Sequence, residues 1–256
     1  MSDLQKIQDS PAGPLRAVEG SFSFACHPGV DCFGVCCQKL DLVLTPYDLL
    51  RLKGALGLPA KELLETHTVP ADPSRSRWPL IRLKMGEDGL CPFLSPEGCR
   101  VYPDRPSACR TYPLARAAKK GGDGRVEERF YQVREDHCLG FDQDRVQTVE
   151  QWVVDQGLTV YHHYNDLWAA IVTHPQGPGE GPQGRAKAGM FYLASYNLDR
   201  FFEFVSSPKF MSLVELDQDR LDKLADNPEE LLQLAFDWMR FSFFGEQTLK
   251  VKLPSS

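Results

Sequence analysis

Eight cysteines, all in the first part of the chain, constrain the fold more than any other feature. Thiolates that converge repel one another unless a soft cation lies among them, and zinc ions and iron-sulfur clusters are the usual solutions. We therefore expect metal to hold this part of the chain together. Four cysteines lie in the run 26–37 and four follow in segments rich in proline and glycine: Cys26, Cys32, Cys36, Cys37, Cys91, Cys99, Cys109 and Cys138.

The composition is that of an ordinary globular protein. Of 256 residues, 42% are hydrophobic and 25% charged, so the chain can bury a core of its own. A net charge of -6 argues against nucleic-acid binding, because it repels a phosphate backbone. No signal peptide and no apolar run of about 18 residues is present, so we expect a cytoplasmic protein without membrane contact. In a reducing cytosol, coordinated or redox-active thiolates are expected rather than structural disulfides.

The pattern along the chain predicts an α+β fold that is α-rich and irregular, with a metal-stapled cysteine-rich part and a helical C-terminal half. Glycine and proline dominate residues 175–184, which favours a loop that lets later helices move over the metal site. Four segments are expected: a loose N-terminal arm (1–20), a cysteine-cluster metal-binding domain (21–175), a flexible loop (176–189) and a helical segment that packs on the first part (190–256).

Capping signals and apolar spacing predict the regular elements. Thr45 before Pro46 predicts the start of a helix that ends at Gly57, and Thr148 with Gln151 predicts a capping box. A glycine-rich run at 119–125 predicts a hairpin turn. Further helices are expected over 59–66, 160–172, 190–205 and 228–244, and strands over 78–85 and 129–134.

The spacing of the first four cysteines indicates how they share metal. If residues 32–37 are helical, Cys32 and Cys36 lie on one face, and Cys37 points about a quarter turn away. The vicinal pair then serves different metal atoms. Eight cysteines suit two four-ligand sites, or one cluster with additional reactive or structural thiols. The spacing matches neither a common zinc module nor a bacterial ferredoxin run. Because the ligand set consists of sulfur alone, we favour one or two iron-sulfur clusters of the 4Fe-4S type, with zinc as the alternative.

Several neighbours of the cysteines are also candidates for the site. His27 and His137 each adjoin a cysteine and are possible ligands, although a hydrogen-bonding role nearby is the simpler interpretation. Arg100, Arg105 and Arg110 lie close in sequence to Cys99 and Cys109. Cationic side chains would lower thiolate pKa values and partly neutralise an anionic cluster, and surface ion pairs are the alternative role.

Several longer segments carry a family resemblance. They are Cys26-His-Pro-Gly-Val-Asp-Cys32 with Cys36-Cys37, Leu44-Thr-Pro-Tyr-Asp-Leu-Leu-Arg-Leu52, Cys91-Pro-Phe-Leu with Gly98-Cys99-Arg-Val-Tyr102, Arg105-Pro-Ser-Ala-Cys109-Arg-Thr-Tyr-Pro113, and Arg134-Glu-Asp-His-Cys138-Leu-Gly140. Together they resemble the YkgJ-type cysteine-cluster family, a zinc- or iron-chelating domain related to the cysteine-rich part of flagellin lysine methylases. The resemblance implies metal chelation by all eight cysteines, without implying a reaction. Both gaps within residues 26–37 are longer than in the family's short C-x2-C-x2-C-C form.

Three functions are compatible with these observations. The favoured one is a metal-binding protein, most plausibly iron-sulfur, in electron transfer, cluster handling or redox sensing with an unidentified protein partner. The first alternative is a zinc-stabilised interaction module, and the second is an enzyme similar to protein lysine methyltransferases, which rests on the family resemblance alone. No catalytic residue can be named for such an enzyme, because no glycine-rich cofactor loop follows a strand. A helix-turn-helix over residues 45–66 is disfavoured, because its second helix is too acidic to read DNA.

Overall fold

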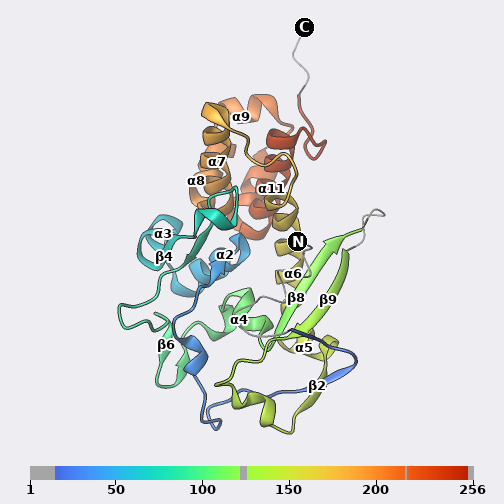
Figure 1. The fold of residues 1–256 in the computed structure, drawn as a ribbon. Coiled ribbons are helices and arrows are strands. Elements are labelled where there is room, and N and C mark those ends of the chain that lie inside the picture. The colour runs from blue at the N-terminus through green and yellow to red at the C-terminus, as the bar shows by residue number, and fades with distance from the viewer. Residues whose placement is uncertain (1–14, 122–125, 217, 253–256) are drawn as a thin grey trace. The chain divides into compact units, whose positions relative to one another are not determined.

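The computed structural model describes residues 15–121, 126–216 and 218–252, and the chain forms two compact units (Figure 1). Unit 1 comprises Met1–Leu40 and Met85–His162, and unit 2 comprises Asp41–Lys84 and His163–Ser256. The helix-rich α+β class expected from the sequence is confirmed. The continuous domain expected over 21–175 is divided, because residues 41–84 group with the C-terminal helices. Among the described residues, no helix combines the length and apolar character that a membrane crossing requires.

The longest strands belong to unit 1 and form a hairpin. Strand β8 (Leu114–Lys120) pairs antiparallel with β9 (Val126–Gln132) (Figure 1). The short β1 (Arg16–Ala17) pairs with the other side of β9. The register from Leu114↔Gln132 to Lys120↔Val126 confirms the expected hairpin. The glycines expected to close it lie largely outside the described residues.

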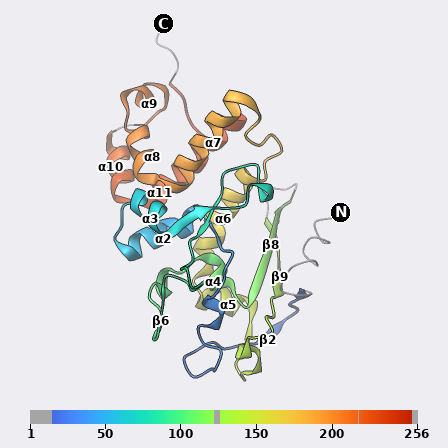
Figure 2. The same ribbon diagram turned by 60° about the vertical axis from the view of Figure 1, so that its left-hand side comes forward.

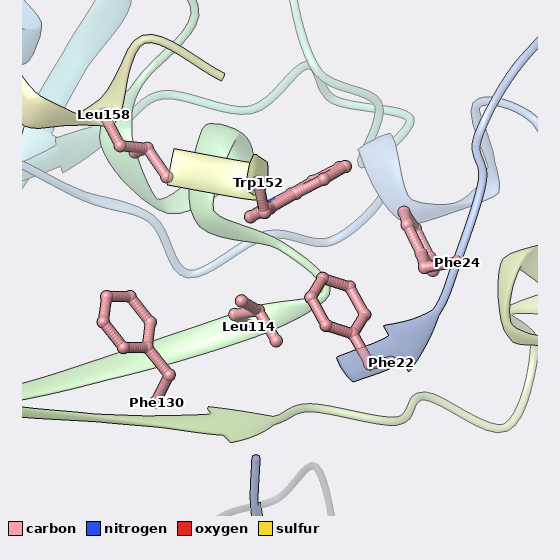
Figure 3. Packing of buried hydrophobic residues seen from close by; sticks show 6 residues of the cluster. All are labelled: Phe22, Phe24, Leu114, Phe130, Trp152 and Leu158. Carbon is pink, nitrogen blue, oxygen red and sulfur yellow. The ribbon is translucent and has the colours of Figure 1, made fainter. Parts of the chain in front are cut away.

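A small aromatic core supports unit 1. Side chains from β2 (Ser21–Ser23), the hairpin and α5 (Val149–Asp155) point toward one another (Figure 3). The six core residues are Phe22, Phe24, Leu114, Phe130, Trp152 and Leu158. Strand β2 pairs with β10 (Val146–Thr148), which leads directly into α5. The capping box predicted there is confirmed: the Thr148 hydroxyl accepts a hydrogen bond from the Gln151 N–H, and Gln151 accepts one from the Thr148 N–H.

Helices make up most of unit 2 (Figures 1 and 2). They are α2 (Pro46–Leu56), α3 (Ala60–His67), the later part of α6 (Leu158–Val172), α7 (Gly181–Tyr196), α8 (Leu198–Val205), α9 (Pro208–Leu213), α10 (Gln218–Asp226) and α11 (Pro228–Phe244). Three short antiparallel strands accompany them in the order β3 (Val43–Leu44), β5 (Ile81–Leu83), β4 (Thr68–Pro70). The capping box at Thr45 and the stop at Gly57, which adopts φ 64°, confirm the predicted first helix of this unit.

The core of unit 2 is fully enclosed. Leu52, Leu63, Phe201 and Phe236 have no exposed surface. The Trp78 ring stacks on Phe191 and Phe243 with centroid separations of 4.7 and 5.4 Å. Burying a large apolar side chain contributes roughly 1.5–3 kcal/mol, so hydrophobic packing is a major stabilising interaction of this unit.

Two of the predicted C-terminal elements need correction. The loop expected over 176–189 ends early, because helix α7 already starts at Gly181. Proline in its first turn removes no needed N–H, and Gly184 fits where a Cβ would lie 2.4 Å from the Gly179 carbonyl oxygen. The helix expected over 190–205 is interrupted at Asn197, whose side chain accepts a hydrogen bond from the Arg200 N–H and caps α8.

The connection between α6 and α7 is held within unit 2. Arg77 donates hydrogen bonds to the carbonyl oxygens of His174 and Pro175 at 2.7 and 3.0 Å. The His174 ring stacks on Phe244 with a centroid separation of 3.6 Å. The strand predicted over 78–85 begins directly after Arg77. Only Ile81–Leu83 of it forms, because Pro79 has no N–H to donate to a neighbouring strand.

Candidate metal centre

All eight cysteines belong to unit 1, and all are free thiols. Cys26 and Cys36 are exposed, and the other six are half-buried. The cysteines lie in turns, in short helices and at strand ends. Whether each cysteine is a ligand, as the sequence predicts, stays a prediction.

The first cysteine run is less helical than predicted. Turns occupy residues 31–34, and only the 3₁₀ helix η1 (Val35–Cys37) follows. Gly34 adopts φ 82° at the N-terminal cap of η1, a left-handed conformation that separates Cys32 from the helix. The expectation that Cys32 and Cys36 share one helical face is therefore wrong, because the backbone changes direction between them.

Residues around Cys138 lie against the start of this run. The Ala25 N–H donates to the Gly140 carbonyl oxygen at 3.0 Å, and the Leu139 N–H donates to the Cys32 sulfur at 3.2 Å. A Cβ added to Gly140 would lie 2.5 Å from the Phe24 ring, so the two segments are in close contact. Backbone N–H groups that point at sulfur stabilise a thiolate.

The end of the run pairs with a second cysteine segment. The Cys91 N–H donates to the Cys37 carbonyl oxygen at 2.8 Å, and Gln38 forms an antiparallel bridge with Leu90. The chain then turns through β6 (Leu94–Ser95) and β7 (Gly98–Cys99), a short hairpin that ends in Cys99. Cys109 follows on the short helix α4 (Ser107–Thr111).

Electrostatic effects link the cysteines across these segments. Burial, together with the neighbouring thiols of Cys36, Cys32 and Cys138, raises the pKa of the Cys26 thiol to about 11. Cys37 donates a hydrogen bond to Cys36, which lowers the pKa of Cys36 to about 7 and raises that of Cys37. Thiols that resist losing their protons when so close together need a cation to become thiolates, so metal binding must release protons here.

The same effects extend to the remaining cysteines. Cys91 and Cys109 both contribute to the raised pKa of Cys37. Burial is the main cause of the raised pKa values of Cys91 and Cys99. Cys99 also raises the pKa of Cys91, and Cys36 raises that of Cys99. Each of the three later cysteine-bearing segments therefore has a thiol within electrostatic reach of a thiol in the run 26–37.

Arg105 is the cation most closely associated with these thiols. Its guanidinium is buried, lies 3.8 Å from the Tyr102 ring centroid, and donates hydrogen bonds to the Tyr102 carbonyl oxygen and the Gln156 side chain. Burial lowers the pKa of Arg105, whereas Cys109 and Cys99 raise it. The same guanidinium lowers the pKa of Cys26. Arg105 thus places one positive charge among cysteines of three segments.

The other two arginines are less central. Arg110 is buried and donates to the carbonyl oxygens of Arg105, Gln156 and Pro103. It stabilises the loop that carries Arg105. Arg100 is exposed and donates to the Pro92 carbonyl oxygen, within the segment between Cys91 and Cys99.

Tyr112 was not predicted from the sequence as part of the site. Burial and the adjacent Cys138 thiol raise the pKa of its hydroxyl, and its ring packs edge-on against Phe24 at 5.8 Å. Tyr112 and Cys138 both contact the aromatic core, so that core also positions the last cysteine. Its place three residues after Cys109 was the only available signal.

The two histidines next to cysteines, His27 and His137, are exposed. The Nδ1 atom of His27 accepts a hydrogen bond from the Gly29 N–H at 3.1 Å. Within the described ranges, no three His, Cys, Asp or Glu side chains stand close enough to hold a metal ion without movement. The donor set is nevertheless chemically suited to zinc or iron, because it consists of soft thiols with an adjacent buried cation.

Comparison with protein families confirms the resemblance. Residues 25–139 match the model of the CxxCxxCC family, described as "Putative zinc- or iron-chelating domain". This part of the chain is similar to that family, and the match supports a metal-binding cysteine-cluster protein. Comparison with curated proteins and with solved structures gives no match.

Proposed function

We propose that the protein binds iron-sulfur clusters of the 4Fe-4S type in unit 1 and exchanges electrons with a protein partner. The observation that carries the proposal is the donor set: all eight thiols belong to one compact unit. Thiolate sulfur is the usual protein ligand of iron-sulfur clusters, which supply one-electron redox chemistry when bound.

The protein's own residues suit that role. The Leu139 N–H and the Arg105 guanidinium place positive charge near sulfur, which favours the more negative, reduced state of a cluster. Exposed Cys26 and Cys36 put one side of the site at the surface of unit 1, within reach of a partner. Cluster handling and redox sensing would use the same exposed side, and a reducing compartment would keep the thiols available.

A zinc-stabilised interaction module is the second candidate. The family description includes zinc, and the core of unit 1 is small. Structural zinc contributes folding free energy directly, so metal would compensate for limited hydrophobic burial. The resemblance to lysine methylases adds no observation from the described residues and stays a prediction.

Anaerobic purification with iron, zinc and acid-labile sulfide analysis tests the proposal. We expect iron and sulfide in equal amounts, with a broad absorption near ~400 nm that bleaches on reduction, because thiolate-to-iron charge transfer is lost. Stoichiometric zinc without sulfide would overturn the iron-sulfur proposal in favour of the zinc module. If the bound cluster could not be reduced reversibly, the proposed role in electron transfer would be wrong.

A further inference from the structure

We infer that unit 1 holds two separate four-cysteine metal sites, divided at the peptide bond between Cys36 and Cys37. The first group is Cys26, Cys32, Cys36 and Cys138, and the second group is Cys37, Cys91, Cys99 and Cys109. The inference rests on the proposed function only in requiring that metal binds, and it applies equally to iron-sulfur clusters and zinc.

Backbone hydrogen bonds tie the first group together. Ala25, next to Cys26, donates to Gly140, and Leu139 donates directly to the Cys32 sulfur. The two residues that follow Cys138 therefore contact the segments of the two earlier cysteines. Cys36, Cys32 and Cys138 are the three cysteines that affect the Cys26 thiol electrostatically, which agrees with this grouping.

A different set of contacts ties the second group together. The Cys91 N–H donates to the Cys37 carbonyl oxygen, so these two residues are adjacent across a bridge. The β6–β7 hairpin then returns the chain toward Cys91: the Arg100 N–H, next to Cys99, donates to the Phe93 carbonyl oxygen at 2.9 Å. Cys109 joins this group because it acts electrostatically on the Cys37 thiol, as Cys91 does.

Local geometry separates Cys36 from Cys37. Both lie on the 3₁₀ helix η1, in which successive side chains diverge by roughly 120° because there are three residues per turn. One side chain can therefore turn toward Cys26 and Cys138 while the next turns toward Cys91. The hydrogen bond between the two thiols and the effect of Cys36 on Cys99 show that the groups are neighbours.

Ligand chemistry independently favours two sites. A structural zinc ion takes four protein ligands, and a 4Fe-4S cluster is held by four cysteines. Eight cysteines in two groups of four match two such centres.

Metal content of cysteine variants tests the division. Cys32→Ser and Cys91→Ser should each remove half of the metal. The double variant Cys32→Ser/Cys138→Ser should lose no more than half, because both residues serve one site. The double variant Cys32→Ser/Cys91→Ser should lose all of it. Val35→Ala, an exposed change on the same 3₁₀ helix, should retain the full content.

If a variant fails to fold, a metal titration of the wild-type protein still tests the number of sites. Cobalt(II) added anaerobically to the metal-free full chain should give sulfur-to-metal charge-transfer absorption that saturates at two equivalents. Saturation at one equivalent, or complete loss of metal in both single variants, would overturn the division. Sulfide and iron content decides the iron-sulfur proposal separately, since two zinc ions with this variant pattern would support two sites while overturning iron-sulfur chemistry.

Discussion

Units 1 and 2 are stabilised in different ways. Unit 2 encloses large side chains completely, among them Leu52, Phe201 and Phe236, on long amphipathic helices. Unit 1 has a six-residue aromatic core, short strands and loops, and the eight half-buried or exposed cysteines. Hydrophobic burial is therefore the main stabilising interaction in unit 2, whereas we expect bound metal to contribute a larger share of the stability of unit 1.

Metal removal should show the largest difference between the units. Structural zinc contributes about 10–16 kcal/mol in small metal-binding peptides at neutral pH, so a chelator should strongly destabilise unit 1. Hydrogen exchange resolved by residue should show lost protection over residues 21–40 and 85–148. Protection in α7 and α11 should change little. Equal loss in both units would contradict the comparison.

A core truncation should have the reverse effect. Phe201→Ala empties a fully buried site in unit 2 and should lower the free energy of unfolding by about 3–5 kcal/mol. Metal content should stay at the wild-type level, as metal analysis of the folded variant would show. Leu213→Ala, at an exposed position of α9, is the matched control and should be nearly neutral. Metal loss in Phe201→Ala would make the two units interdependent.

High pH should weaken unit 2 through Tyr47. Burial and the Glu229 carboxylate, which accepts a 2.7 Å hydrogen bond from its hydroxyl, raise the pKa of Tyr47. Because the folded pKa lies above the unfolded value of about 10, stability is complete below pH 10 and falls as the pH rises further.

Tyr47→Phe keeps the ring that stacks on Tyr164 at 4.7 Å but removes this hydrogen bond. It should cost roughly 1.5–3 kcal/mol at pH 7 and flatten the alkaline decline. Urea unfolding of the wild-type protein and of Tyr47→Phe between pH 7 and 11 measures the two free energies of unfolding. An unchanged alkaline slope would assign the pH dependence to other groups.

The smallest expected effect uses the two capping boxes as a matched pair. Thr45→Ala in unit 2 and Thr148→Ala in unit 1 each remove the same kind of hydrogen bond, worth about 0.5–2 kcal/mol. Thr45→Ala should lower the melting temperature of metal-loaded and metal-free protein alike. Thr148→Ala should matter mainly in the loaded protein, because unit 1 is already destabilised without metal. Identical responses would argue that unit 1 folds unaided.

Local signals in the sequence predicted helix starts and the hairpin, because caps and glycine-rich turns act over a few residues. The sequence did not predict the early start of α7, because its first residues are rich in glycine and proline, as a loop would be. The close approach of Gly184 to Gly179 is visible only in the structure. The cysteines themselves were identifiable as site candidates from their clustering. Their neighbours were not: the contacts of Tyr112 with Cys138 and of Leu139 with Cys32 are long-range and depend on tertiary structure.

The interleaving of the two units along the chain affects their order of synthesis. Residues 41–84 emerge from the ribosome before residues 85–162, which complete unit 1 with its last cysteine, and residues 163–256 follow. At about 5–20 residues per second, α7 and α11, which contact α2, are synthesised roughly 6 to 35 seconds after α3. Metal can thus be loaded onto the nascent chain while Leu52 and Leu63 are still uncovered. Slower growth at low temperature and ample chaperone should therefore improve the yield of folded protein.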